Sequence, residues 1–246
     1  KNPPRKLEAT GPPRPEPTGK RYSRSVDNAT WMLFGTPSFT ADGNTLVSLG
    51  TFYSKSPKPG HEQQSVMLIW NLNSDSREYI YRGQQYAAEI TPDGRGIAVT
   101  DRGGCALWPW PIAKGKGRLT HPLWTQQDVL GREGTFAFTP DGKETVAISK
   151  QGLIGRYDAK SGKLLQHISD AGTYKLLAVS PDGINVAAVQ VDDPGTDRWR
   201  SVIDVYNIRS GSLLMGVDGA EWTDGARLQF TANSRFLVIP EINGIA

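Results

Sequence analysis

The sequence is poor in the residues that build disulfides and metal sites. It contains a single cysteine, Cys105, so it predicts no internal disulfide framework. The three histidines, His61, His121 and His167, do not share the spacing of metal ligands with one another or with the cysteine. We therefore expect no bound metal and no cofactor. The lack of disulfides is typical of a reducing compartment, which favours the cytoplasm but leaves the localisation open.

Long apolar runs and catalytic motifs are also missing. No run of about 18 apolar residues exists, so the sequence predicts no helix inserted in a membrane. The G-x-S-x-G elbow of many hydrolases is absent. The Gly142-Lys143 and Gly162-Lys163 pairs are followed by Glu and Leu, whereas a phosphate-binding loop needs Ser or Thr there. These absences favour a soluble protein that is not an enzyme.

Charge is unevenly distributed along the chain. The net charge is +3, but seven basic and two acidic residues among 1–25 give that segment +5 and leave −2 for the remainder. A nucleic-acid surface needs basic residues clustered on the folded part, so we expect no nucleic-acid partner. Residues 1–28 are rich in proline and basic side chains and poor in apolar ones. They are interpreted as a linker or extended arm.

One pattern recurs five times after this arm. A short strand leads into Thr or Ser, usually Pro, then Asp or Asn and Gly or Ser, and a run rich in β-branched residues follows. Proline presets the turn, Asp can accept bonds from backbone amides, and glycine tolerates the left-handed conformation that ends the turn. Successive turns are 41 to 51 residues apart, which is the period of propeller blades. The five segments begin at Pro37, Ala88, Phe136, Leu177 and Leu228.

The second half of each complete repeat predicts two further strands. An aromatic residue recurs at a matching place, as Trp70, Trp108, Tyr157 and Tyr206. In the last two repeats a Ser-Gly turn and a fourth apolar segment follow. Four strands are the content of one propeller blade.

These residues carry a resemblance to a known repeat. The pattern "FTPDG … TVAIS … GLIGRYDAKSGKLLQHI" resembles the WD40-like β-propeller repeat, with Tyr157-Asp158 where that family has Trp-Asp. Trp70-Asn71 and Tyr206-Asn207 are degenerate versions, and the Gly-His dipeptide that opens a typical repeat is missing. The resemblance covers about residues 29–246. It implies an all-β fold, a β-propeller of four-stranded antiparallel blades, and no particular activity.

The predicted domains are therefore an arm, 1–28, and WD40-like blades, 29–246. Four complete repeats and part of a fifth are present. We interpret the segment "ATWMLFG", residues 29–35, as a closing strand that the N-terminal side lends to the last blade. We expect the chain to be part of a larger, bacterial-type multidomain propeller, and a five-bladed ring is the alternative.

The long connections of the repeats hold the candidate interface residues. Inserts at 52–64, 120–134, 191–200 and 217–226 fall on one rim of a propeller. Aromatic and Arg side chains on such a rim are typical interface anchors. For Trp124 and Trp199 a role in covering the core beneath a loop is equally supported. The candidate residues are Trp124, Arg198, Trp199, Arg200 and Trp222.

The leading hypothesis is a non-catalytic scaffold that binds a protein or peptide over this loop-rich rim. One alternative is a propeller-type hydrolase or lyase with its site at the central channel. The first strands, which line that channel, offer only Glu89 and Gln229 as polar side chains that could act there. A second alternative is a structural assembly module that associates with itself through open blade edges.

Overall fold

The computed structural model describes residues 29–40, 42–54, 63–74, 76–81, 85–111, 122–130, 135–192, 200–218 and 228–238. The predicted arm, 1–28, lies outside these ranges. The described ranges contain eighteen strands, β1 to β18, and within them no helix occurs. Consequently, none of the described segments is a helix suited to crossing a membrane.

The strands form five antiparallel sheets, which we call blades 1 to 5 in chain order. Blade 1 contains β1 (Ala29–Phe39), β2 (Thr45–Ser54), β3 (Gln63–Asn71) and β4 (Ser76–Tyr81). Blade 2 contains β5 (Gln85–Ile90), β6 (Gly96–Asp101), β7 (Gly104–Pro109) and β8 (Trp124–Gln126). Blade 3 contains β9 (Phe136–Phe138), β10 (Glu144–Ile148), β11 (Ile154–Asp158) and β12 (Leu164–His167). Blade 4 contains β13 (Tyr174–Val179), β14 (Asn185–Asp192), β15 (Arg200–Asn207) and β16 (Leu213–Asp218), and blade 5 begins with β17 (Gln229–Phe230) and β18 (Leu237–Val238).

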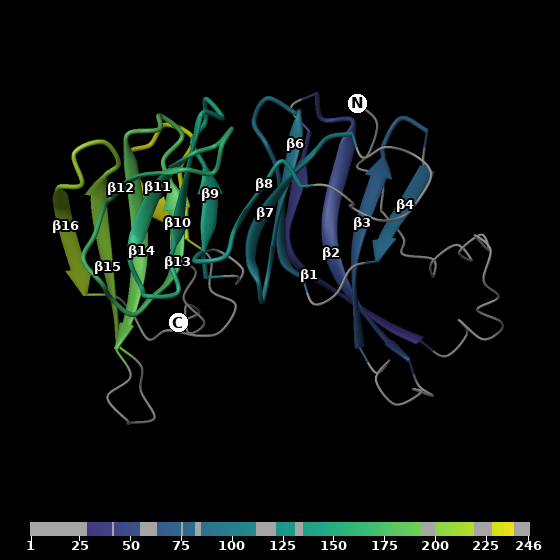
Figure 1. The fold of residues 1–246 in the computed structure, drawn as a ribbon, viewed down its shortest axis with the longest axis horizontal. Coiled ribbons are helices and arrows are strands. Elements are labelled where there is room, and N and C mark those ends of the chain that lie inside the picture. Colours follow the sequence, from purple (N-terminus) through teal and green to yellow (C-terminus); the bar gives the residue numbers. More distant parts are fainter. Residues whose placement is uncertain are drawn as a thin grey trace, which may run out of the picture.

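Neighbouring blades pack face to face, and each junction has its own apolar cluster (Figure 1). The second strands are buried on both faces, as their β-branched runs predict. In β10, Val146 packs toward blade 4 and Ala147 toward blade 2, and both are fully buried. The repeated aromatics Trp108, Tyr157 and Tyr206 each join the cluster shared with the preceding blade. This packing confirms the predicted fan of blades.

The recurring turn has a role beyond closing a hairpin, because it also links the blades. In all five turns the Thr or Ser hydroxyl donates to the Asp or Asn two residues later, over 2.5 to 2.7 Å. Gly142 has φ 68°, and a Cβ added to it would lie 3.5 Å from Pro92 in the preceding turn. A Cβ on Gly183 would lie 3.3 Å from Pro140. The glycine of one turn therefore packs against the proline of the preceding turn, and successive turns stack on one another.

The prediction that residues 29–35 form the closing strand of the last blade is wrong. This segment is the first part of β1 and pairs with β2, from Ala29 opposite Ser54 to Phe39 opposite Leu46. A bulge between Phe34 and Ser38 absorbs the change in register. Because β2 is ten residues long, it offers the segment a partner next to it in sequence, so pairing within blade 1 satisfies its backbone.

Candidate functional site

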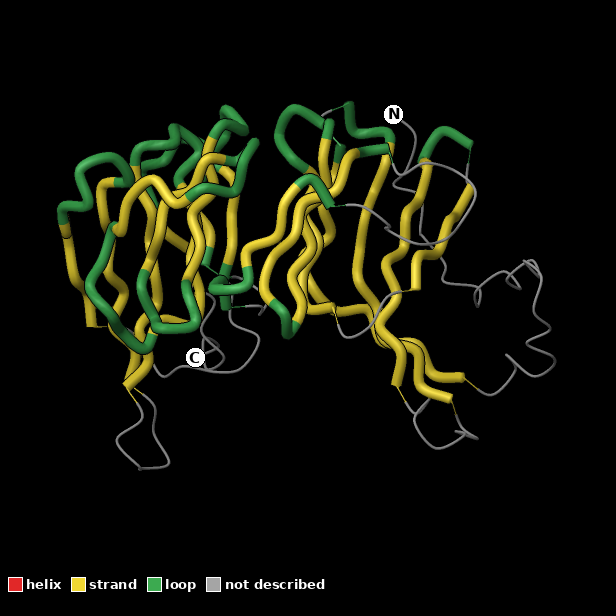
Figure 2. The backbone as a smooth tube through the Cα atoms, in the orientation of Figure 1, coloured by secondary structure: helices red, strands yellow, loops and turns green. Residues whose placement is uncertain are grey.

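Two long hairpins project from the same side of the array (Figure 2). In blade 4, β14 and β15 pair without interruption from Asn185 opposite Asn207 to Asp192 opposite Arg200. In blade 1, β2 and β3 pair from Thr45 opposite Asn71 to Tyr53 opposite Gln63. The corresponding strands of blade 3, β10 and β11, pair over only five positions. We call this the hairpin side, and the opposite side, which bears the stacked turns, the turn side.

The candidate interface residues are only partly placed by the structure. Arg200 is the first residue of β15 and sits at the end of the blade 4 hairpin, opposite Asp192. Arg198 and Trp199 belong to the connection 193–199, and Trp222 to 219–227, and both segments lie outside the described residues. The structure thus puts Arg200 at the described end of a projecting hairpin, next to the connection that the sequence singled out.

Trp124 occupies the core rather than the rim surface. It begins β8, is 9% exposed, and packs with Leu107 and Tyr157 between blades 2 and 3. Its indole Nε1 donates a hydrogen bond of 2.8 Å to the carbonyl oxygen of Ala159 in blade 3. This burial agrees with the core-covering alternative, because the indole has no open face left for a partner.

A buried polar network joins the strands of blade 4. The Tyr174 hydroxyl lies 3.1 Å from Asp204 Oδ2 and 2.7 Å from the Tyr206 hydroxyl. Burial raises the pKa of Tyr174, and its hydrogen bond with Tyr206 raises it further. Burial likewise raises the pKa of Tyr206. The network joins β13 to β15 within the blade. Its hydroxyls stay neutral and act as structural donors.

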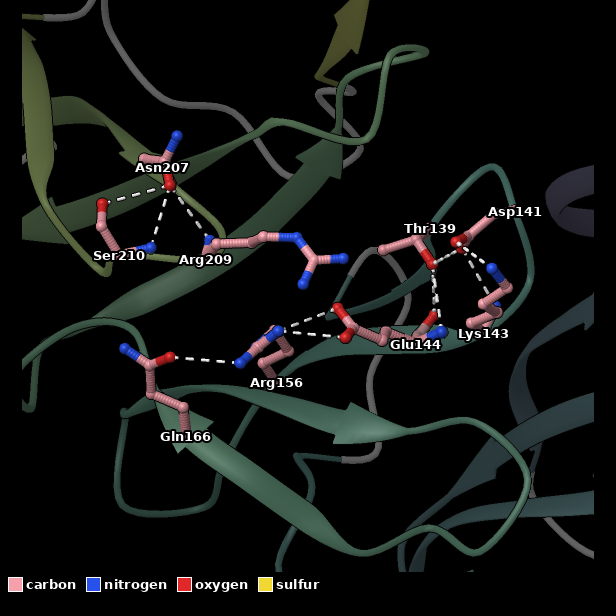
Figure 3. Close-up of polar contacts among 9 residues, drawn as sticks. All are labelled: Thr139, Asp141, Lys143, Glu144, Arg156, Gln166, Asn207, Arg209 and Ser210. Carbon is pink, nitrogen blue, oxygen red and sulfur yellow. Dashed lines mark hydrogen bonds and ion pairs between the residues drawn. The ribbon is translucent and has the colours of Figure 1, made fainter.

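A second polar network crosses blade 3 near the turn side (Figure 3). Arg156 Nη1 lies 3.0 and 3.2 Å from the two carboxylate oxygens of Glu144, and Nη2 lies 3.3 Å from Gln166 Oε1. These contacts brace β10, β11 and β12, and the ion pair is largely buried. Figure 3 shows Arg209, from the β15–β16 turn of blade 4, extending toward this pair. Because the Arg156 charge is matched by Glu144, the network is a structural brace.

The aspartates of the stacked turns are held ionised by their own turns. Hydrogen bonds from the Thr139 hydroxyl and the Lys143 amide lower the pKa of Asp141, and the nearby charges of Lys143 and Arg209 lower it further. In the other turns the equivalent hydroxyl and backbone amide of each turn lower the pKa of Asp42, Asp93 and Asp182. The turn carboxylates therefore act as hydrogen-bond acceptors rather than as general acids.

Glu89 lies on the inner strand β5, but its carboxylate is engaged at a blade junction. Its neighbours Ala88 and Ile90 face blade 1, so the alternation of a strand turns Glu89 toward blade 3. The amide of Phe138 in β9 donates a hydrogen bond to this carboxylate. Burial raises the pKa of Glu89 to about 7. Cys105 shares the face, and burial and the Glu89 charge raise the pKa of its thiol.

The sequence predicted Glu89 to line the central channel and did not indicate its place at the junction of blades 2 and 3. The signal was present, because a single carboxylate stands between the apolar residues Ala88 and Ile90. Gln229, the other polar residue named for the channel, is exposed on β17. Within the described ranges, no group of three or more His, Cys, Asp or Glu residues could hold a metal ion. His167 is exposed on β12, and His61 and His121 lie outside those ranges.

The outer strand of blade 4 presents apolar side chains to solvent. Leu213, Met215 and Val217 of β16 are all exposed. Met215 lies opposite Val205, and Val217 opposite Ile203, so both share the face that blade 4 turns toward blade 5. Only two strands of blade 5, β17 and β18, are described.

Comparisons with known proteins bear on the fold. No protein-family model and no curated protein sequence matches this chain. A solved structure of hydrazine synthase from Kuenenia stuttgartiensis matches with a TM-score of 0.58 and 18% identity, over 82% of this chain and 54% of that one. TolB from Acinetobacter baumannii matches with a TM-score of 0.51 and 15% identity, over 77% and 44%. The chain thus spans about half the length of the structures that it matches. Both are β-propeller proteins, and with the face-to-face blades this shows that the chain folds as an all-β propeller of four-stranded antiparallel blades.

Proposed function

We propose that this chain is a non-catalytic interaction module that binds a protein or peptide partner on its hairpin side. The observation that carries the proposal is the pair of extended hairpins in blades 1 and 4, whose paired strands project beyond the array on one side. Paired strands are ordered before binding, so a partner that contacts their ends meets a lower entropic cost of ordering them. The blades behind the hairpins form a packed support.

The residues around the start of β15 suit such a role. Arg198, Trp199 and Arg200 are consecutive, and Arg200 opens β15 at the hairpin end. Tryptophan and arginine are the residue types that most often contribute strongly to interfaces, through large apolar area and bidentate donors. Trp222, in the connection after β16, is a further candidate on the same grounds.

The positions of the titratable groups support a non-catalytic role over the enzyme alternative. The groups with raised pKa, among them Glu89, Cys105 and Tyr174, lie in the packing between or within blades. Acid–base catalysis needs such groups to converge where a substrate can reach them. Each of these groups instead lies among packed or hydrogen-bonded neighbours that account for its raised pKa.

Two finer assignments belong to the same proposal. We assign the repeats to the WD40-like type, on the turn motif and on the aromatics Trp108, Tyr157 and Tyr206 at matching positions. Self-assembly with a second copy of this chain is the second candidate function, favoured by the exposed apolar side chains of β16. Oligomeric mass by light scattering over a range of concentrations separates it from a monomeric scaffold.

The proposal is tested with the double substitution Trp199→Ala/Arg200→Ala, at and immediately before the first residue of β15. The matched control is Lys160→Ala/Lys163→Ala, which changes two exposed residues at the β11–β12 turn of blade 3 on the turn side. Proteins captured by the immobilised wild type are identified by mass spectrometry, purified, and titrated calorimetrically against all three chains. We expect the hairpin variant to bind at least about tenfold more weakly and the control to bind as the wild type does. A purified partner that binds all three chains equally would place the site elsewhere.

A further inference from the structure

The junction between blades 2 and 3 differs from the other junctions of the array. The backbones of these two blades approach each other less closely than those of the other neighbouring blades. In Figure 1, β1 to β8 and β9 to β18 stand as two groups on either side of this junction. Large side chains fill it, among them Leu107 and Trp124 from blade 2 and Phe138 and Tyr157 from blade 3. We call this junction the joint.

The inner edge of the joint is held by an ionisable side chain. At the junction of blades 1 and 2, the hydroxyl of Ser38 accepts a hydrogen bond of 3.1 Å from the amide of Ile90. At the joint, Glu89 and Phe138 occupy the corresponding places, and the Phe138 amide donates to the Glu89 carboxylate. The corresponding residues of blades 3 and 4, Ala137 and Ala178, have no polar side chain. Among these four blades, only the joint uses a group whose charge can change.

The outer edge of the joint is held by groups that do not titrate. The Trp124 indole donates to the carbonyl oxygen of Ala159, and the Gln126 side-chain amide donates to the carbonyl oxygen of Gly162. Gly162 packs directly on the Trp124 ring, because a Cβ added there would lie 2.8 Å from the ring. The outer edge therefore keeps the same contacts at every pH near neutrality.

Other ionisable groups lie around the joint. In blade 2 the charges of Glu89 and of Asp101, at the end of β6, both raise the pKa of the Cys105 thiol. In blade 3 burial and the charge of Asp128, in the connection before β9, raise the pKa of Tyr157. Burial raises the pKa of both the thiol and the phenol, so these two groups are neutral where Glu89 titrates. With a pKa of about 7, Glu89 is a group of the joint whose charge changes near neutrality.

We propose that the joint is a proton-controlled hinge: the inner edges of blades 2 and 3 meet while Glu89 is protonated, and they part when it is ionised. A half-buried carboxylate with one amide donor gains more hydration by opening than the neutral acid does. The motion turns about the outer contacts of Trp124. The hairpins of blades 1 and 4 lie on opposite sides of the joint, so opening changes their separation. The test below does not depend on the proposed partner binding.

Cys105 is a built-in reporter of the joint. It is the only cysteine of the chain, it is 3% exposed, and it packs in the apolar cluster of the joint. The experiment measures its labelling rate by a dithiopyridine reagent, divided by the rate for the urea-unfolded chain at the same pH. The equilibrium constant for opening rises with pH as long as Glu89 is ionised in the open state but still protonated in the closed state. It levels off once Glu89 is ionised in both states. We expect the normalised rate to rise at least about tenfold from about pH 5 to about pH 7 and then to level off.

Two variants and one further measurement make the outcome decisive. Glu89→Gln keeps the shape and removes the charge, so its normalised rate stays low and flat with pH. Asp101→Asn removes the other carboxylate near the thiol and keeps the rise of the wild type. Labelling through the joint is independent of low urea concentrations, whereas labelling through global unfolding rises steeply with urea. A flat wild-type profile, the same rise in Glu89→Gln, or a steep urea dependence would each overturn the proposal.

Discussion

Replacing Glu89 by glutamine should make the stability of the propeller less dependent on pH. Burial raises the pKa of Glu89 from its ordinary value of 4.5 to about 7 in the folded chain. Between these values the folded state binds more protons than the unfolded state, so the free energy of unfolding falls as pH rises. The loss is complete once the pH exceeds the folded-state pKa. Glu89→Gln has no proton to lose and should show no such fall.

The size of the effect follows from the pKa. A shift of one unit corresponds to about 1.4 kcal/mol, so the shift of Glu89 corresponds to at most about 3 kcal/mol. This value is a ceiling, because part of the surface of Glu89 stays exposed to solvent, and solvent screens the cost of its charge. At about pH 8 the Gln variant should therefore be more stable than the wild type by up to about 3 kcal/mol, and at about pH 5 the difference should shrink to about 1 kcal/mol or less.

Urea unfolding followed by tryptophan fluorescence measures this difference at each pH. The lower limit of about pH 5 keeps the turn aspartates ionised, because hydrogen bonds from their own turns lower the pKa of Asp93, Asp141 and Asp182. These residues are unchanged in both chains, so their contribution cancels. Parallel stability profiles for the two chains would refute the reasoning, because they would show that Glu89 has the same pKa in both states.

Two further substitutions test contacts between and within blades. Gly162→Ala should destabilise by about 2 kcal/mol or more, because its φ is +69° and the new Cβ would meet the Trp124 ring at 2.8 Å. Gly94→Ala is the matched control: φ is also +69°, nothing lies within 4 Å, and the cost should be about 1 kcal/mol; equal urea midpoints for the two variants would contradict the predicted contact. Tyr174→Phe should cost about 1–3 kcal/mol in urea unfolding, since it removes the hydroxyl bonded to Asp204, and a change below about 0.5 kcal/mol would argue against a structural role for that network.

Much of the fold could be predicted because its determinants are local. The turn needs a hydroxyl, an aspartate and a glycine within four residues, and Thr139, Asp141 and Gly142 form it through contacts two to three residues apart. A period of 41 to 51 residues then sets one blade per repeat. The closing-strand interpretation failed because an apolar strand pattern does not specify its partner, and β2 was long enough to pair with the whole of β1.

Some features of the candidate site could likewise be predicted from the sequence, and others could not. Sequence located the connection containing Arg198 and Trp199, because inserts between predicted strands are visible as breaks in the repeat. It could not decide whether Trp124 was an anchor or a core residue, since burial depends on Ala159 and Tyr157 of the next blade.

By itself, the sequence determined that the chain builds repeated four-stranded units, because turns and strand alternation depend on residues a few positions apart. Only the tertiary structure decided where Glu89 and Trp124 act. Their partners lie about 35 to 50 residues away in the next blade, and it is the contact between blades that buries one as a core residue and raises the pKa of the other.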